Sequence, residues 1–291
     1  MKNGIYDILK SHWHASEFRP GQKEAITAVL DNKDCLVVLP TGGGKSLCYQ
    51  LPALTKPGLC VVISPLIALM SDQVESLNKK EVRAMNLSGP MREDDLVTAL
   101  DNCKFGGFKF LYLSPERAQH PLVQDRLSEM QLCLLAIDEA HCISEWGHDF
   151  RPAYREIIGL KNKLSNTPTI ALTATATKRV KEDICKALEL AQPVQITNSF
   201  DRPNIEIKVL KTTNKLEAIS EALAPKGTPA IVYAGTRKSV ELLSTHLNNM
   251  GHQTNFFHGG ALAKEKCVAN WMQEKMAGRK KVLLRFSEET P

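Results

Sequence analysis

The residues most able to do chemistry form a glycine-rich turn between an expected strand and an expected helix. The turn follows an apolar run at positions 36–39 and consists of Pro40, Thr41, Gly42, Gly43, Gly44, Lys45 and Ser46. Glycines let backbone N–H groups approach phosphate oxygens, because no Cβ stands in the way. A following helix points the positive end of its dipole at the same place. Lys45 would reach the β- and γ-phosphates of a nucleotide, and the Ser46 hydroxyl would ligate Mg²⁺. The alternative is a chance glycine-rich turn.

An acidic pair, Asp138 and Glu139, follows directly on the apolar run 132–137. At the end of a buried strand, Asp138 could hold Mg²⁺, which suits one or two carboxylates together with phosphate oxygens. Glu139 could orient and deprotonate the water that attacks a γ-phosphate. Two solvated acids are the alternative, but that does not explain their place after a buried run. With the phosphate loop, the pair predicts a site that hydrolyses ATP with Mg²⁺.

Two further features have weaker meaning on their own. Gln22 precedes the phosphate loop, and its amide could both donate to and accept from the N6/N7 edge of adenine; a polar residue at a helix start is the alternative. The segment 142–152 is dense in aromatic, His and Arg side chains, which stack on bases and pair with phosphates. The alternative is a packed loop with Trp146 and Phe150 in the core.

These motifs need a scaffold, and the hydrophobic pattern supplies one. Short apolar runs alternate with segments of helical spacing, which predicts an α/β fold with a parallel sheet covered on both faces. The expected strands of the first half lie near residues 36–39, 59–64, 82–87, 108–114, 132–137 and 169–172. In such sheets ligands bind at the carboxyl ends of the strands. The loop, the acidic pair and Thr173-Ala174-Thr175 all fall at those ends, so one cleft would collect them.

The rhythm changes around residues 199–204, which we take as a domain boundary. We expect one domain over residues 1–200 and a second, partial α/β domain over residues 201–291. The second half predicts strands near 205–210, 230–234, 255–258 and 282–284, and helices near 215–223, 237–250 and 263–276.

Composition sets the broad class. The 291 residues are 43% hydrophobic and 24% charged with a net charge of +5, which is ordinary for a globular protein and compatible with a nucleic-acid partner. The eight cysteines form no Cys-x-x-Cys pair, so we expect a reduced, cytoplasmic protein without a disulfide framework. No apolar run approaches the ~20 residues that span a bilayer, so no membrane partner is expected.

The segment from Asp138 to Pro152 closely resembles motif II and the aromatic-rich loop of the RecQ-family DNA helicases of superfamily 2. Other motifs agree in order: 18–22, 39–51, 64–73, 172–177, 199–204, 231–233 and 258–259. The resemblance covers residues from about 5 to 278. It implies a RecA-like P-loop domain, an ATP-dependent 3′-to-5′ DNA helicase of DNA repair and recombination, and as partners single-stranded DNA and duplex DNA with a 3′ tail.

The resemblance also implies roles for individual residues. Arg19 and Gln22 would read adenine, and His141 would join Lys45, Asp138 and Glu139 in the catalytic set. Thr173 and Thr175 would link the ATP state to DNA movement. The residues that would bind single-stranded DNA are Trp146, His148, Phe150 and Arg151.

The chain departs from the family after residue 284, where motifs V and VI do not follow. We therefore expect a C-terminally truncated second domain and impaired unwinding. Two other functions stay open: a nucleotide-gated DNA-binding module with little turnover, and a P-loop ATPase that acts on a partner protein. The aromatic segment is evidence against the latter. The sequence gives no expectation for the oligomeric state.

Overall fold

The structure is a computed structural model, and it describes residues 2–147, 149–199, 205–206, 208–223, 230–256 and 282–285. The chain divides into two compact units, Met1–Arg202 and Pro203–Pro291, and each is described here by itself.

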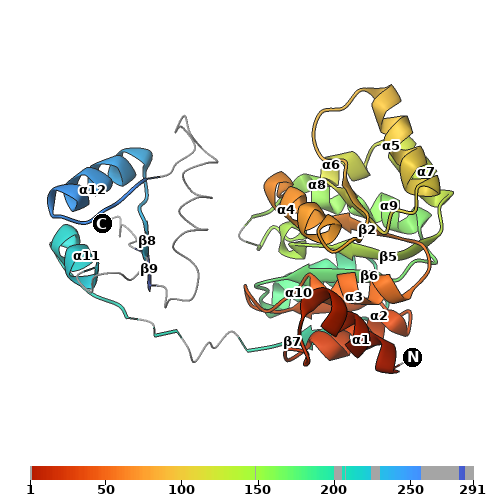
Figure 1. The fold of residues 1–291 in the computed structure, drawn as a ribbon, viewed down its shortest axis with the longest axis horizontal. Helices are drawn as coiled ribbons and strands as arrows, with labels where there is room; N and C mark the ends of the chain where they lie inside the picture. Colours follow the sequence, from red (N-terminus) through yellow and green to blue (C-terminus); the bar gives the residue numbers. More distant parts are fainter. Residues whose placement is uncertain are drawn as a thin grey trace. The chain divides into compact units, whose positions relative to one another are not determined.

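A seven-stranded sheet organises the first unit (Figure 1). Its strand order is β3-β4-β2-β5-β6-β1-β7, and every neighbouring pair is parallel. The strands are β1 (Cys35–Val38), β2 (Leu59–Ile63), β3 (Ala84–Asn86), β4 (Phe110–Leu113), β5 (Leu132–Ile137), β6 (Thr169–Thr173) and β7 (Val194–Thr197). Because all strands are parallel, their carboxyl ends lie along one edge of the sheet.

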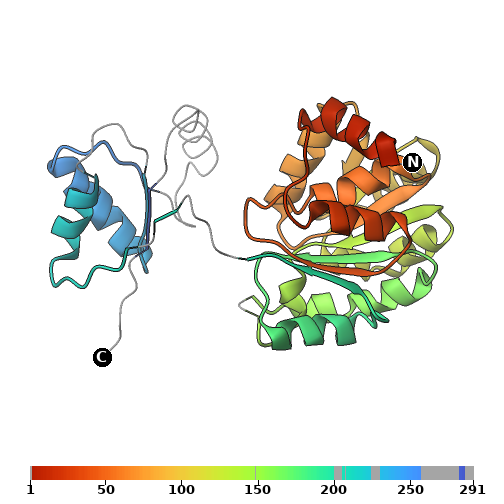
Figure 2. The ribbon, with the colours of Figure 1, turned by 90° about the horizontal axis from the view of Figure 1, so that it is seen from below.

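Helices cover both faces of this sheet, and Figure 2 shows the red and orange helices on one face and the green ones on the other. The first group is α1 (Lys2–Trp13), α2 (Gln22–Leu30), α3 (Leu47–Thr55) and α4 (Ile67–Asn78). The opposite face carries α5 (Glu93–Phe105), α6 (Pro115–Ala118), α7 (Pro121–Ser128), the 3₁₀ helix η1 (Ala140–Ile143), α8 (Pro152–Arg155), α9 (Ile157–Lys163) and α10 (Lys178–Ala187).

Alternation along β1 explains why the sheet is buried on both sides. Cys35 and Val37 belong to the core under α2, α3 and α4, whereas Leu36 and Val38 belong to the core under α5 and α10. Successive side chains of a strand point to opposite faces, so a strand that is apolar at every position requires cover on each side. The α/β fold with a parallel sheet and helices on both faces, predicted from the sequence, is confirmed.

Two segments differ from what the sequence predicts. The edge strand β7 was not predicted, because Gln195 and Thr197 occupy its exposed positions and only two of its four residues are apolar. Residues 205–206 and 208–210 form no strand, contrary to expectation, and Val209 and Leu210 are exposed. Their apolar side chains therefore do not form the half-buried pattern that a strand needs.

The second unit contains α11 (Lys215–Leu223), β8 (Ala230–Tyr233), α12 (Arg237–Asn249) and β9 (Val282–Arg285). β8 and β9 pair in parallel. These four elements match the expected ones to within one residue at each end. Asn255 and Phe256 form no strand. The rest of that expected strand, the helix expected at 263–276, positions 258–259 and most of the expected boundary at 199–204 lie outside the described residues. In the part of the chain that the structure describes, no helix is long and apolar enough to cross a membrane.

Candidate active site

The candidate site lies at the carboxyl edge of the sheet, where backbone hydrogen bonds fix the strand ends. The Leu39 N–H donates to the Thr173 carbonyl at 3.2 Å, which joins the end of β1 to the end of β6. The Asp138 N–H donates to the Ile63 carbonyl at 2.8 Å, which joins the end of β5 to the end of β2. The loops that follow these strands therefore start from fixed positions.

The phosphate loop joins β1 to α3 and depends on its glycines. Gly42 and Gly44 have φ angles of 79° and 77°, a region that side-chain-bearing residues avoid. The Gly43 N–H donates to the Pro40 carbonyl at 2.8 Å, and a Cβ at Gly43 would lie only 2.8 Å from that oxygen. Position 39, where the full phosphate-loop pattern has glycine, holds a leucine that is buried in the core. The loop therefore begins after Leu39, which is used for packing.

Arg19 and Gln22 contact the phosphate loop from outside. The Gln22 amide donates to the carbonyls of Gly43 and Gly44 at 3.2 and 3.1 Å, and it accepts from the Arg19 N–H at 2.8 Å. The Arg19 guanidinium donates to the Gly42 carbonyl. Gln22 is buried, so its amide braces the loop. That both residues read adenine stays a prediction.

Asp138 and Glu139 stand beside one another after β5. The Glu139 N–H donates to Asp138 Oδ1 at 3.0 Å, and the Tyr154 hydroxyl donates to the Asp138 carbonyl at 2.9 Å. Burial, and then the charge of Glu139, raise the pKa of Asp138 to about 6, while Lys45 opposes this rise. Glu139 has a φ of 49°, a left-handed conformation that is uncommon for a residue with a side chain. A carboxylate held with so little water favours a cation as its partner.

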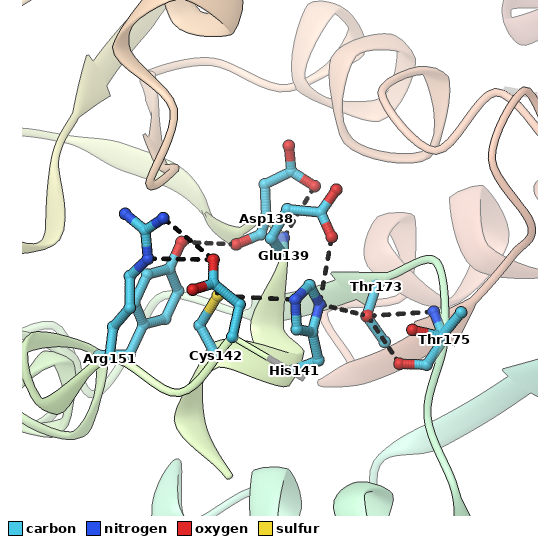
Figure 3. A network of polar contacts seen from close by, with 9 residues as sticks. Asp138, Glu139, His141, Cys142, Arg151, Thr173 and Thr175 are labelled. Carbon is cyan, nitrogen blue, oxygen red and sulfur yellow. Dashed lines mark hydrogen bonds and ion pairs between the residues drawn. The ribbon is translucent and has the colours of Figure 1, made fainter. Parts of the chain in front are cut away.

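His141 connects the acidic pair to the end of β6 (Figure 3). Its Nδ1 atom lies 3.2 Å from Glu139 Oε2 and 3.0 Å from Thr173 Oγ1. The Thr173 hydroxyl donates to the Thr175 carbonyl at 3.1 Å. His141 and Thr173 are both buried. A change at Glu139 can therefore reach residues 173–175 through one imidazole ring.

The aromatic loop, residues 144–151, leaves η1 on the same edge. Trp146 is 62% exposed, so the alternative that it packs in the core is wrong. The guanidinium of Arg179 lies 3.6 Å from the centre of its ring. Phe150 is half-buried, with the guanidinium of Arg155 4.9 Å from its ring centre. His148 lies outside the described residues.

Arg151 joins the aromatic loop to the turn after β2. Its guanidinium donates to Asp149 Oδ2 at 3.0 and 3.2 Å and to the Pro65 carbonyl at 3.2 Å. The Asp149 carboxylate raises the pKa of Arg151. A cleft of about 310 Å³ runs between these parts, and its lining residues are Thr41, Pro65, Leu66, Glu139, His141, Cys142, Asp149, Ala174 and Thr175. The phosphate loop, the acidic pair and the aromatic loop thus border one space.

This arrangement agrees with the comparisons with known proteins. The family model described as DEAD/DEAH box helicase matches residues 19–184. The chain belongs to this family. The matched part of the chain includes the phosphate loop, the acidic pair and the aromatic loop.

Curated relatives are RecQ-type helicases, which confirms the resemblance seen in the sequence. The chain is 42% identical over 261 residues to the probable ATP-dependent DNA helicase RecS of Bacillus subtilis, covering 88% of this chain and 52% of that one. It is 41% identical over 254 residues to the ATP-dependent DNA helicase RecQ of Haemophilus influenzae, covering 87% and 41%. The chain thus spans about half the length of these relatives, or less.

Solved structures share the fold at lower identity. A crystal structure of the DUF1998 helicase MrfA bound to DNA and AMPPNP aligns with a TM-score of 0.69 at 18% identity, over 91% of this chain and 41% of that one. At this identity the likeness shows the fold alone, which is the RecA-like α/β fold of helicases.

The donor set of the candidate site can be tested against Mg²⁺. Within the described residues, no group of three or more His, Cys, Asp or Glu side chains could hold a metal ion by itself. Asp138 offers a desolvated carboxylate, and Ser46 offers a hydroxyl at the start of α3. Mg²⁺ binds one or two protein oxygens and takes the rest from phosphates and water, so this sparse set fits it.

Sequence reasoning missed three contributors to the site. Tyr154 holds the Asp138 carbonyl, Asp149 pairs with Arg151, and Arg179 covers the ring of Trp146. Asp149 lies within the aromatic segment itself. The sequence carried a signal for Arg179 as well. The first turn of α10 contains basic residues and no acidic ones, and positive charge at a helix N-terminus is unfavourable because it opposes the helix dipole.

Proposed function

We propose that this chain is the ATP-hydrolysing motor part of a RecQ-type DNA helicase that moves 3′ to 5′ along single-stranded DNA. The observation that carries the proposal is the pair of contacts made by His141, to Glu139 at 3.2 Å and to Thr173 at 3.0 Å. These contacts link Glu139 to Thr173, and the next two residues, Ala174 and Thr175, line the same cleft as Asp149 of the aromatic loop.

The roles in ATP hydrolysis follow from position and charge. Backbone N–H groups of residues 42–46 and the Lys45 ammonium would hold the phosphates. Asp138 and Ser46 would hold Mg²⁺, which neutralises phosphate charge when bound. Glu139 would accept the proton of the attacking water. His141 would keep the Glu139 carboxylate oriented, since it contacts one of its oxygens.

DNA would bind at the aromatic loop. The exposed ring of Trp146 offers a surface on which a base can stack, and the ring of Phe150 and the guanidinium of Arg151 lie further along the loop. His148, which precedes them in the sequence, is proposed to bind DNA as well. Thr173 and Thr175 would pass the ATP state on to this loop. The proposed partners are single-stranded DNA and duplex DNA with a 3′ tail, and the proposed location is inside the cell.

The proposed domain organisation matches these roles. Residues 1–200 would form the ATP-binding RecA-like domain, and residues 201–291 would contribute part of a second one. Division of the chain at Arg202 supports this proposal.

The decisive experiment measures ATPase rate against added oligonucleotide. We expect single-stranded DNA to stimulate hydrolysis and Trp146→Ala to weaken that stimulation, because stacking contributes ~1–3 kcal/mol per base. Phe105→Ala is the matched control, since Phe105 is another exposed aromatic residue, at the end of α5. Normal stimulation of Trp146→Ala would contradict the DNA role of the loop. DNA binding that depends on ATP without turnover would favour the nucleotide-gated binding module. Strand displacement on duplexes with 3′ or 5′ tails tests the polarity.

A further inference from the structure

Helix α10 holds the aromatic loop at two points, through Arg179 and Asp183, which both lie outside the motifs named in the sequence analysis. The helix begins at Lys178, three residues after Thr175, and the Thr177 hydroxyl caps it by accepting from the Val180 N–H at 3.3 Å. Arg179 and Asp183 are four residues apart, so they lie on one face of the helix. Both contact the loop between η1 and α8.

The first contact is a hydrogen bond with a buried partner. The Ser144 hydroxyl donates to Asp183 Oδ2 at 2.5 Å, and Ser144 is fully buried. The same hydroxyl accepts from the Trp146 N–H at 3.2 Å. Asp183 therefore fixes the backbone of the loop two residues before its exposed tryptophan.

The second contact involves the tryptophan ring itself. The Arg179 guanidinium lies 3.6 Å from the ring centre, which is a stacking distance. Trp146 nevertheless remains 62% exposed, so most of its side chain stays open to solvent. Among the described residues, no carboxylate lies within ion-pair distance of Arg179. Its planar charge is therefore directed at the ring.

The position of Arg179 is costly for the helix by itself. The first turn of α10 contains Lys178, Arg179 and Lys181 and no acidic residue. Positive charges at a helix N-terminus oppose the helix dipole. Lys178 is exposed like Arg179, but no ring contact involves it among the described residues. The two neighbours thus carry the same charge and differ in their contact with Trp146.

We infer that Arg179 is a positioning residue for DNA binding. It holds the Trp146 ring from one face, so that the opposite face is presented to a nucleobase of single-stranded DNA. Asp183 fixes the backbone from which this ring projects. The stacking surface is thereby fixed to the helix that begins three residues after Thr175. This inference rests on the proposed function, in which Trp146 stacks on DNA.

The test uses the full chain and measures the oligo(dT) concentration that gives half-maximal ATPase stimulation. We expect Arg179→Ala to raise this concentration about three- to tenfold, the range of a cation–π contact. Arg179→Lys keeps the charge but loses the planar guanidinium. On a logarithmic scale, its half-maximal concentration should therefore lie closer to that of Arg179→Ala than to that of the parent chain. Lys178→Ala is the control for charge and should change the concentration less than twofold. In a Trp146→Ala background, Arg179→Ala should have no further effect.

The outcomes separate this inference from the proposed function. If Trp146→Ala is stimulated normally, both are overturned. If Trp146→Ala is impaired but Arg179→Ala behaves like the parent chain, only the role of Arg179 is overturned. Three other results would each show that Arg179 acts on the DNA phosphates by charge and not through the ring. They are equal effects of Arg179→Ala and Lys178→Ala, full restoration by Arg179→Lys, and an undiminished effect of Arg179→Ala in the Trp146→Ala background.

Discussion

Glu139 is the residue on which turnover should depend most. It lies next to the half-buried Asp138 and contacts His141, so its carboxylate is held at the edge of the cleft. Glu139→Gln keeps the shape of the side chain but cannot accept the proton of a water molecule. We expect it to bind ATP and to lose hydrolysis by about 10²- to 10⁴-fold. The measurement compares ATP affinity with single-turnover hydrolysis.

Glu75→Gln is a suitable control for that experiment, because Glu75 is an exposed acid on α4 that pairs only with Lys79 among the described residues. It should hydrolyse ATP at the parent rate. Parent-like hydrolysis by Glu139→Gln would show that another group accepts the proton.

The raised pKa of Asp138 predicts how the stability of the chain depends on pH in the absence of metal. Burial raises its pKa to about 6, above the value of about 3.9 that it has in an unfolded chain. The folded state therefore binds the proton more tightly, and stability falls as the pH rises from about 4 to about 6. Above that window the ionised carboxylate costs as much as about 3 kcal/mol. We expect Asp138→Asn to stabilise the chain in EDTA.

The check for Asp138 is urea unfolding of both chains in EDTA at pH 5 and pH 7.5. The gain from Asp138→Asn should be about twice as large at pH 7.5, since only part of the cost has developed at pH 5. An equal gain in the free energy of unfolding at pH 5 and pH 7.5 would mean that Asp138→Asn does not act by removing the carboxylate charge. Added Mg²⁺ and nucleotide should reverse the order of stability, because the ionised carboxylate then has a cation as its partner.

At the scale of elements, the start of α2 and the phosphate loop act together. Gln22 donates to two loop carbonyls, and Arg19 donates to a third. Gln22→Ala removes this brace. We expect it to weaken binding of both ATP and GTP by about tenfold, the effect of losing one to two net hydrogen bonds, and also to relax the preference for ATP. Titration with both nucleotides measures the two effects separately.

Gln119→Ala gives a matched comparison for Gln22→Ala. Gln119 follows α6, and its amide also donates to a backbone carbonyl, that of Ala153, at 3.1 Å. It should leave the ratio of ATP to GTP affinity unchanged. If Gln22→Ala weakens both nucleotides equally and keeps their ratio, Gln22 braces the loop and adenine is read by other residues.

The sequence predicted elements better than the contacts between them. The phosphate loop and the acidic pair are runs of neighbouring residues, and the buried strands are continuous apolar runs, so local pattern was enough to find them. The contact of His141 with Thr173 joins residues 32 positions apart, and that of Arg179 with Trp146 joins helix α10 to the aromatic loop, which local pattern cannot relate. β7 was not predicted from the sequence, because an edge strand needs few apolar residues.

At the scale of the whole molecule, the phosphate loop, the acidic pair and the cleft beside them all lie in the first unit. The three hydrophobic clusters of the first unit contain only residues before position 200. The residues that contact the phosphate loop, and the cleft beside it, also lie within Met1–Arg202. A domain with its own hydrophobic core can fold by itself.

We therefore expect a fragment of residues 1–202 to unfold in one cooperative transition and to bind ATP with an affinity within about threefold of the full chain, or within about 0.7 kcal/mol. Lys45→Ala in the same fragment should abolish binding, because it removes the ammonium that faces the phosphates. The measurements are thermal unfolding with and without nucleotide, and calorimetric titration. A fragment that folds but does not bind ATP would show that residues beyond 202 complete the nucleotide site. A fragment that does not fold would show that the second unit stabilises the first, although the core of the first unit is built from its own strands and helices.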